Sequence, residues 1–491
     1  MEIVFNSIFR EELSIKEIQE AMDNGEITSK ELVMYYLYRI AKYDQDGPTF
    51  NSMLEINPEA IFTAEALDNE RQLKGARGPL HGIPVVLKDN IETYDSMHTS
   101  AGTIALENYL ANQDAFLVEK LREAGAVILG KANMTELANG MSSEMWAGYS
   151  SRGGQTLNPY GDPELFVGGS SSGSAVAVAS NFSVLSVGTE TDASILSPAI
   201  QNSVVGIKPT VGLISRSGII PFTYSQDTAG PFARTVKDAA ILLGALTGID
   251  KKDVATYKSE GRSQQDYTSY LSMNGLNGAR IGIFNNAPKE YYESGEYDEH
   301  LFEDAIQTLI EQGANVIEDI EIPSFDRKWN WGVPLYELKH SLDNFLAKMP
   351  SHMPVHSILE LTRFNKTIEE KALKYGQDKL ENRVKFPNTL RNPEYLTSKI
   401  EDLYFSQEQG IDYALEQYKL DAILFPSYIG STISAKAGYP SIAVPAGYMD
   451  SGRPFGITFS GTAFSEGILI KIAFAFEQAT KHRKAPKFEK N

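Results

Sequence analysis

The hydrophobic positions near the start of the chain follow a helical period. Five apolar residues recur at the three- and four-residue spacing of one helix face: Leu32, Val33, Tyr36, Leu37 and Ile40. Ser14-x-x-Glu17 and Thr28-x-x-Glu31 each fit the capping box that begins a helix, and Gly25 between them fits a helix end. The pattern therefore predicts a helical segment over about residues 1–75.

After Gly82 the pattern changes, because short apolar runs alternate with helical segments. The predicted strands are 83–87, 126–129, 184–187, 280–284, 422–425, 441–444 and 456–459. The predicted helices include 114–124, 174–180, 235–246 and 465–482. Such alternation is typical of an α/β protein with helices on both faces of a sheet. We expect one large domain with a mixed, twisted central sheet, a core over about 78–250 and returning core elements over about 420–482.

The stretch from about 287 to 418 differs from the rest, because it is charged, helical in pattern and rich in tyrosine. We interpret it as a helical insertion. Residues 290–304 carry seven acidic side chains, which we expect to form a solvated surface, since no His/carboxylate spacing of a metal site occurs. A further hypothesis makes residues 327–393 a lid or substrate wall. Four aromatic residues would build it: Trp329, Trp331, Tyr336 and Phe345.

Composition narrows the function classes. The 491 residues are 42% hydrophobic and 22% charged, with a net charge of −19, so a basic nucleic-acid surface is not expected. There is no cysteine, which excludes disulfides and thiolate nucleophiles. The first residues lack a basic region followed by an apolar one, and no apolar run reaches membrane-spanning length. We expect a cytoplasmic protein without a membrane partner.

The segment VGGSSSGSAVAVAS (167–180) carries the strongest chemical signal. A linker is disfavoured because the segment leads directly into a small-residue helix. A phosphate-binding loop is disfavoured because no lysine occurs between Lys131 and Lys208. A G-x-S-x-G nucleophile elbow centred on Ser171 fits the letters, but a proline-containing loop precedes it instead of a strand. A tightly packed loop at a helix N-terminus remains, where backbone amides favour negative charge.

Three polar residues are expected at one edge of the sheet. Lys88 ends a predicted strand, Ser170 precedes a predicted helix, and Ser194 follows the strand that succeeds this helix. If helix and strand pack antiparallel, Ser170 and Ser194 lie together, because sites of α/β sheets form at the carboxyl ends of strands. Each residue also has an ordinary explanation: a lysine after a strand is usually a surface charge, and a serine in a turn is usually a cap.

The chain resembles the amidase signature family of hydrolases over most of its length. The segments that carry the resemblance follow in the family's order: GPLHGIPVVLKDN (78–90), GAVILGKANMTELA (125–138), LNPY (157–160), GGSSSGSAVAVA (168–179), GIKPTVGLISRSGIIP (206–221), SQDTAGPFARTVKDAA (225–240), DAILFPS (421–427), AGYPSIAVPAG (437–447) and GRPFGITFSG (452–461). The central insertion is not covered. The resemblance implies the amidase signature fold and hydrolysis of a carboxylic amide to an acid and ammonia or an amine.

The resemblance also implies roles at positions of this chain. Ser194 would be the nucleophile, Ser170 the bridging serine at a cis peptide bond, and Lys88 the general base, through an acyl-enzyme and with no metal or cofactor. Burial lowers the pKa of a lysine from its ordinary value near 10.4, and Lys88 follows an apolar run. Backbone N–H groups of four residues would hold the oxyanion: Thr191, Asp192, Ala193 and Ser194. The expected substrate is a small-molecule or short-peptide amide.

The segment before Ser194 departs from the family's usual Gly-Thr-Asp-x-Gly-Gly-Ser, because Asp192 and Ala193 replace glycines. The variant is similar to that of bacterial peptide amidases, which favours C-terminal peptide amides. A glutamine-hydrolysing amidotransferase subunit is an alternative, although the segment ILSP (195–198) lacks the arginine usual there. A serine esterase using Ser171, or a catalytically inactive binding protein with Ala193 as the lesion, are further alternatives.

Overall fold

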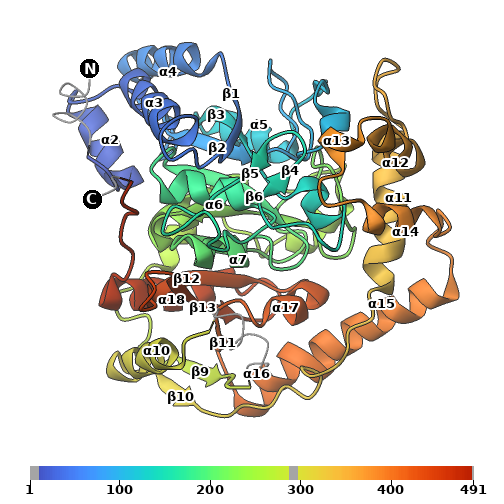
Figure 1. Ribbon diagram of the computed structural model, residues 1–491. Coiled ribbons are helices and arrows are strands. Elements are labelled where there is room, and N and C mark those ends of the chain that lie inside the picture. The colour runs from blue at the N-terminus through green and yellow to red at the C-terminus, as the bar shows by residue number, and fades with distance from the viewer. Residues whose placement is uncertain (1–9, 287–296, 489–491) are drawn as a thin grey trace.

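The computed structural model describes residues 10–286 and 297–488. Within these residues, eleven strands form one mixed sheet in the order β1-β3-β2-β6-β8-β7-β12-β13-β11-β9-β10 (Figure 1). Strand β2 pairs in parallel with both β3 and β6, whereas β8, β7, β12 and β13 pair antiparallel with their neighbours. The expected single α/β domain with a mixed sheet is confirmed.

The strands of the main sheet are β1 Met53–Ile56, β2 Pro84–Lys88, β3 Val127–Ala132, β6 Leu185–Glu190, β7 Val205–Lys208, β8 Thr228–Ala233, β9 Arg280–Ile283, β10 Asn315–Ile317, β11 Ala422–Pro426, β12 Ser441–Tyr448 and β13 Pro454–Ser460, and a small hairpin is made of β4 Tyr149–Ser150 and β5 Gly154–Gln155. All seven predicted strands are present, and most extend a few residues beyond the predicted ends.

The helices are α2 Ile15–Asp23, α3 Ser29–Arg39, α4 Ala60–Lys74, α5 Phe116–Glu123, α6 Ser172–Ala179, α7 Leu196–Gln201, α8 Val236–Leu246, α10 Glu299–Glu311, α11 Gly332–Leu346, α12 Ile358–Thr367, α13 Glu369–Ala372, α14 Asp378–Val384, α15 Pro393–Ser406, α16 Asp412–Tyr418, α17 Ser431–Ala437 and α18 Glu466–Thr480. Both predicted capping boxes are formed, at Ser14 and at Thr28. In Figure 1, helices α2, α3 and α4 lie on one side of the molecule, and helices α11 to α15 lie on the opposite side.

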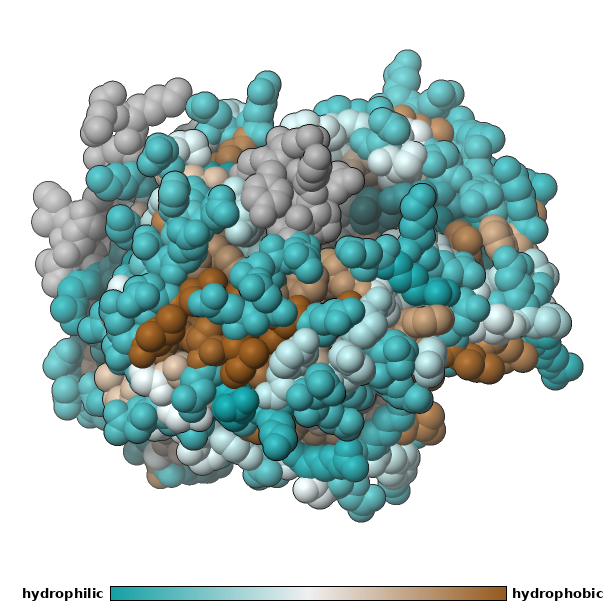
Figure 2. Space-filling view, turned by 90° about the horizontal axis from the view of Figure 1, so that it is seen from below, coloured by the Kyte–Doolittle hydropathy of each residue, from teal (hydrophilic) through white to brown (hydrophobic). Residues whose placement is uncertain are grey.

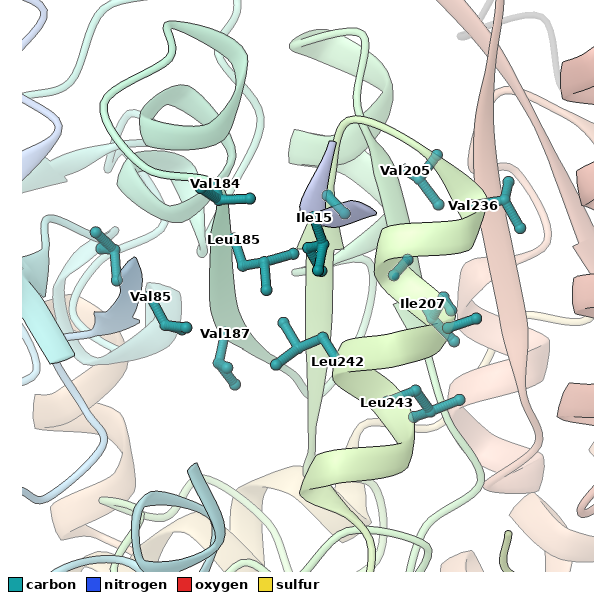
Figure 3. Close-up of a cluster of buried hydrophobic side chains, with 14 of the residues drawn as sticks. Ile15, Val85, Val184, Leu185, Val187, Val205, Ile207, Val236, Leu242 and Leu243 are labelled. Atoms are coloured by element: carbon teal, nitrogen blue, oxygen red, sulfur yellow. The ribbon is translucent and has the colours of Figure 1, made fainter. Parts of the chain in front are cut away.

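Burial on both faces of the sheet explains why the sequences of the central strands are continuous apolar runs. Every residue of β2 and β6 is buried, since helices cover both faces of the sheet. Val85 of β2, Val187 of β6 and Leu242 of α8 belong to one buried cluster, shown in Figure 3. Burying an aliphatic side chain of this size contributes roughly 1.5–3 kcal/mol. This rigid core fixes the strand ends from which the polar residues project.

The central segment is not wholly helical, which corrects the expectation for residues 287–418. Strand β10 forms the edge of the main sheet beside β9, and α10 packs against β12 and α18. Part of the acidic stretch 290–304 lies outside the described residues; within them Asp298 caps α10. No cluster of three or more His, Cys, Asp or Glu suited to a metal occurs in residues 10–286 and 297–488.

The face shown in Figure 2 is mostly hydrophilic, with a band of hydrophobic residues in its middle. Across the described ranges, no helix combines the length and the apolar character needed to cross a bilayer.

Candidate active site

Lys88 is the last residue of β2 and lies between the parallel neighbours β3 and β6. Its side chain is completely buried. Its Nζ donates to Ser170 Oγ at 2.7 Å, to Ser171 Oγ at 2.9 Å and to the carbonyl of Thr189 at 3.0 Å. The strand end therefore delivers the lysine to the serine-rich loop, as the sequence predicts.

Burial lowers the pKa of Lys88 to about 7, although the nearby carboxyls of Glu190 and Asp227 act in the opposite direction. The desolvation of the ammonium is the larger effect. About half of the lysines are therefore neutral near pH 7, so this amine can accept a proton from a bonded hydroxyl.

Ser170 lies directly before α6, and the peptide bond between Gly169 and Ser170 is cis. The small residues of this loop follow from its packing. A Cβ on Gly169 would stand 2.6 Å from Thr135 Oγ1, and a Cβ on Gly173 would overlap the carbonyl oxygen of Ser52. The glycines thus let the loop and the start of α6 sit directly on their neighbours, which holds the Ser170 hydroxyl beside Lys88.

Ser194 lies in the bend that follows β6, in the same region as Ser170. The backbone N–H of Ser171 donates to the carbonyl of Ser194 at 3.2 Å, which joins the two loops. The buried carboxylate of Glu190 accepts hydrogen bonds from the N–H groups of Ile195 at 2.6 Å and Leu196 at 3.0 Å. Glu190 therefore fixes the backbone on the far side of Ser194.

Residues 191–194 present free donors. In the described part of the chain, the backbone N–H groups of Thr191, Asp192, Ala193 and Ser194 donate to no protein acceptor. Ala193 has a φ of 60°, in the left-handed region that favours glycine. The alanine that departs from the family pattern therefore keeps a glycine-like backbone conformation.

A cavity of about 950 Å³ opens onto these loops, and its wall includes Ser170 and residues 191–194. The central segment also contributes to its lining, through α11 and α14. Of the four aromatic residues assigned to a lid, Trp331 lines this cavity, whereas Phe345 lines an adjoining cavity of about 430 Å³. Trp329 and Tyr336 instead pack within hydrophobic clusters.

Ser171 is placed differently from Ser170 and Ser194. It is fully buried, its Oγ donates to the carbonyl of Thr189 at 2.9 Å, and it accepts from the Thr189 N–H at 3.2 Å. It is not among the residues lining the cavity. A loop, not a strand, precedes it. These features disfavour Ser171 as a nucleophile.

Some residues of the cavity were not found by sequence reasoning. Lys379 and Arg383 of α14 line the same wall as Trp331. They lie in the central segment that the resemblance does not cover, and nothing in their spacing marks them. Only the three-dimensional packing of α14 brings them to the serines.

Comparison with known proteins shows the family of this chain. A sequence model of the family described as Amidase matches residues 31–470, including the central segment. A probable amidase of Arabidopsis thaliana is 42% identical over 492 residues, covering 97% of this chain and 92% of that protein. The structure of native peptide amidase from Stenotrophomonas maltophilia is 41% identical, with a TM-score of 0.91 over 98% of this chain and 99% of that one. A glutamyl-tRNA(Gln) amidotransferase subunit of Halorhodospira halophila is 32% identical over 505 residues, covering 96% of this chain and 98% of that protein.

The chain therefore belongs to the amidase family, and its fold is the amidase signature fold that the motifs predict. The protein is an amidase, an enzyme that hydrolyses amide bonds.

Proposed function

We propose that Ser194, Ser170 and Lys88 form the catalytic triad of this amidase. The observation that carries the proposal is the 2.7 Å contact between Lys88 Nζ and Ser170 Oγ at the wall of the cavity that also contains Ser194. An amine with a pKa near 7 is matched to proton transfer at neutral pH.

We propose a proton path that begins at the hydrogen bond between Lys88 Nζ and Ser170 Oγ and continues to Ser194 on the same cavity wall. Neutral Lys88 takes the proton of Ser170, and Ser170 takes the proton of Ser194 while Ser194 Oγ attacks the amide carbon. When the carbon–nitrogen bond breaks, the proton returns through Ser170 to the leaving nitrogen, which departs as ammonia or an amine. Water then attacks the acyl-enzyme by the same route and releases the acid.

The oxyanion would be held by the free N–H groups of residues 191–194. A donor of this kind contributes about 10²–10³ in rate where its removal has been measured. The chemistry proposed here uses protein groups alone and needs no metal or cofactor.

We further propose that the substrate is a primary amide of a short peptide or similar small molecule. A cavity of about 950 Å³ lies at the upper end of the ~300–1,000 Å³ range of small-molecule sites. The similar structure from Stenotrophomonas maltophilia is a peptide amidase, which supports a peptide-amide substrate. The segment TETD (189–192), which resembles that of peptide amidases, supports the same choice.

The test is ammonia release from a panel of C-terminally amidated dipeptides, aliphatic amides, aryl amides and glutamine. We expect release from amidated dipeptides, and we expect Ser194→Ala to abolish it. Undiminished release by Ser194→Ala, or labelling of Ser171 by a fluorophosphonate, would contradict the triad. The assay with glutamine tests the amidotransferase alternative, which is supported by the similarity to an amidotransferase subunit at 32% identity. The absence of arginine in residues 195–198 argues against it.

A further inference from the structure

Arg383 of α14 is a cationic side chain that lacks an ionic partner. It is 7% exposed and lines the cavity that contains Ser170 and Ser194. Its Nη1 donates to the carbonyl of Lys379 at 2.8 Å, and its buried Nε has no hydrogen-bond partner. Among the described residues, no carboxylate forms an ion pair with it. Within the described part of the chain, Arg383 thus lines the cavity with one side-chain hydrogen bond and an unpartnered Nε.

The surroundings of Arg383 reinforce the positive charge of this wall. Lys379 Nζ donates to two neutral oxygens of Asn139, at 3.1 and 3.3 Å. Burial lowers the pKa of Arg383 to about 10, so it keeps its charge at neutral pH. Asp378 lines the same cavity and its charge acts to raise the pKa of Arg383, while its carboxylate accepts hydrogen bonds from Ser142 and Ser143.

A buried charge without a counter-ion is costly, so proteins rarely retain one unless something binds it. The fold does not require it here, since Arg383 makes a single hydrogen bond to its own helix. A guanidinium recognises a planar carboxylate through two parallel N–H donors. The chain has a net charge of −19, so a positive wall in its substrate cavity is a local feature and not a property of the whole surface.

We propose that Arg383, with Lys379 beside it, binds a carboxylate on the acyl part of the substrate, so that the preferred substrates are primary amides that carry a second, ionised carboxyl group. The proposal rests on the proposed function. Hydrolysis of a primary amide releases only ammonia, so the carboxylate stays with the part bound to Ser194. Peptide amides with an acidic side chain belong to this class.

The experiment measures binding in Ser194→Ala, so that it does not depend on turnover. The ligands are acetyl-Glu-Leu-amide and acetyl-Leu-Glu-amide, each compared with its methionine and lysine counterparts by calorimetry. Methionine has nearly the shape of glutamate without the charge. Of the two glutamate ligands, we expect the one that binds more tightly to exceed the affinity of its methionine counterpart at least about tenfold. This is the contribution expected of a hydrogen bond to a charged group.

Arg383→Met in the same background is expected to reduce this preference to about onefold. Arg363→Met is the matched control, since Arg363 is exposed on α12 and does not line the cavity, and it should leave the preference intact. Because Arg383 is buried and unpaired, Arg383→Met should unfold at an unchanged or higher temperature.

Equal affinity for glutamate and methionine ligands, a preference for lysine, or a preference that survives Arg383→Met would overturn the proposal. A lower unfolding temperature of Arg383→Met together with an unchanged preference would assign Arg383 a structural role instead. Residual hydrolysis by Ser194→Ala would contradict the proposed triad while leaving the binding comparison valid, so the two failures are distinguishable.

Discussion

Replacing Lys88 by methionine is expected to abolish turnover and at the same time stabilise the fold. The pKa of Lys88 falls from its ordinary 10.5 to about 7 because the ammonium is desolvated. Each pKa unit corresponds to ~1.4 kcal/mol, so keeping this lysine in the folded protein costs roughly 4 kcal/mol at pH 7. Methionine fills a similar volume and carries no charge.

The variant also loses hydrogen bonds, which offsets part of the gain. Ser171 Oγ keeps both of its contacts with Thr189, and Ser170 lines the cavity, where water can replace the amine. The loss should therefore amount to about 1–2 kcal/mol. The net expectation is a stabilisation of about 2–3 kcal/mol.

The direction in which stability changes with pH provides a second test of the Lys88 pKa. The folded pKa lies below the unfolded one, so between pH 7 and 10.5 the unfolded chain binds the proton more. Wild-type stability therefore rises with pH over this window, and the advantage of Lys88→Met shrinks. Urea denaturation of both proteins at pH 7 and pH 9.5 measures this difference. A variant that is less stable at pH 7, by an amount that does not change with pH, would refute the assignment of a burial-depressed lysine.

Three other predictions follow from the same site. The kcat/KM for a peptide amide should rise between pH 6 and 8, as the neutral fraction of Lys88 grows from about one tenth to about nine tenths; a profile flat over this range would contradict the base role. Ala193→Gly should retain activity and raise stability by about 0.5–1 kcal/mol in thermal unfolding, because φ is 60° there; a loss of stability would contradict the strain argument. Gly173→Ala should lower stability by about 2–3 kcal/mol and reduce turnover, because the added Cβ would overlap the carbonyl oxygens of Ser52 and Asn133. Calorimetry measures the stability and ammonia release measures the turnover. Wild-type values for both would show that the backbone around Gly173 shifts to accommodate the Cβ.

The sequence predicts seven of the eleven strands described in the main sheet and misses β1, β7, β8 and β10; β1 lies within residues 1–75, which the pattern assigns to a helical segment. Strand β8 contains Gly230 and Pro231, which both disfavour a strand from sequence alone. The structure shows why Gly230 occurs: a Cβ there would overlap the carbonyl of Ile207 in the neighbouring strand. Strand β10 has only three residues, within a segment whose charge and helical pattern masked it.

Lys88 also shows what the sequence leaves open about chemistry. Three lysines are fully buried in the described part of this fold, and burial lowers the pKa of Lys131 and of Lys208 to about 8 as well. Lys131 donates to the carbonyl of Ile91 and to Thr99 Oγ1 at 2.8 Å. Lys208 donates to the carbonyls of Tyr439 and Ser434.

Pattern and burial alone cannot separate these three residues, because each ends or lies within a buried strand. The three lysines differ in the groups that accept hydrogen bonds from their amines. Backbone carbonyls have no proton to give, so Lys208 is held by groups that favour its charged form. Lys131 has one hydroxyl partner, Thr99, and Thr99 lines neither of the two cavities described above. Lys88 contacts the hydroxyl of Ser170, which faces the cavity and can release a proton into the reaction. The chemistry thus depends on where the loop before α6 places one hydroxyl. The sheet geometry predicts that Lys88, Ser170 and Ser194 share one edge, and the family resemblance assigns their roles.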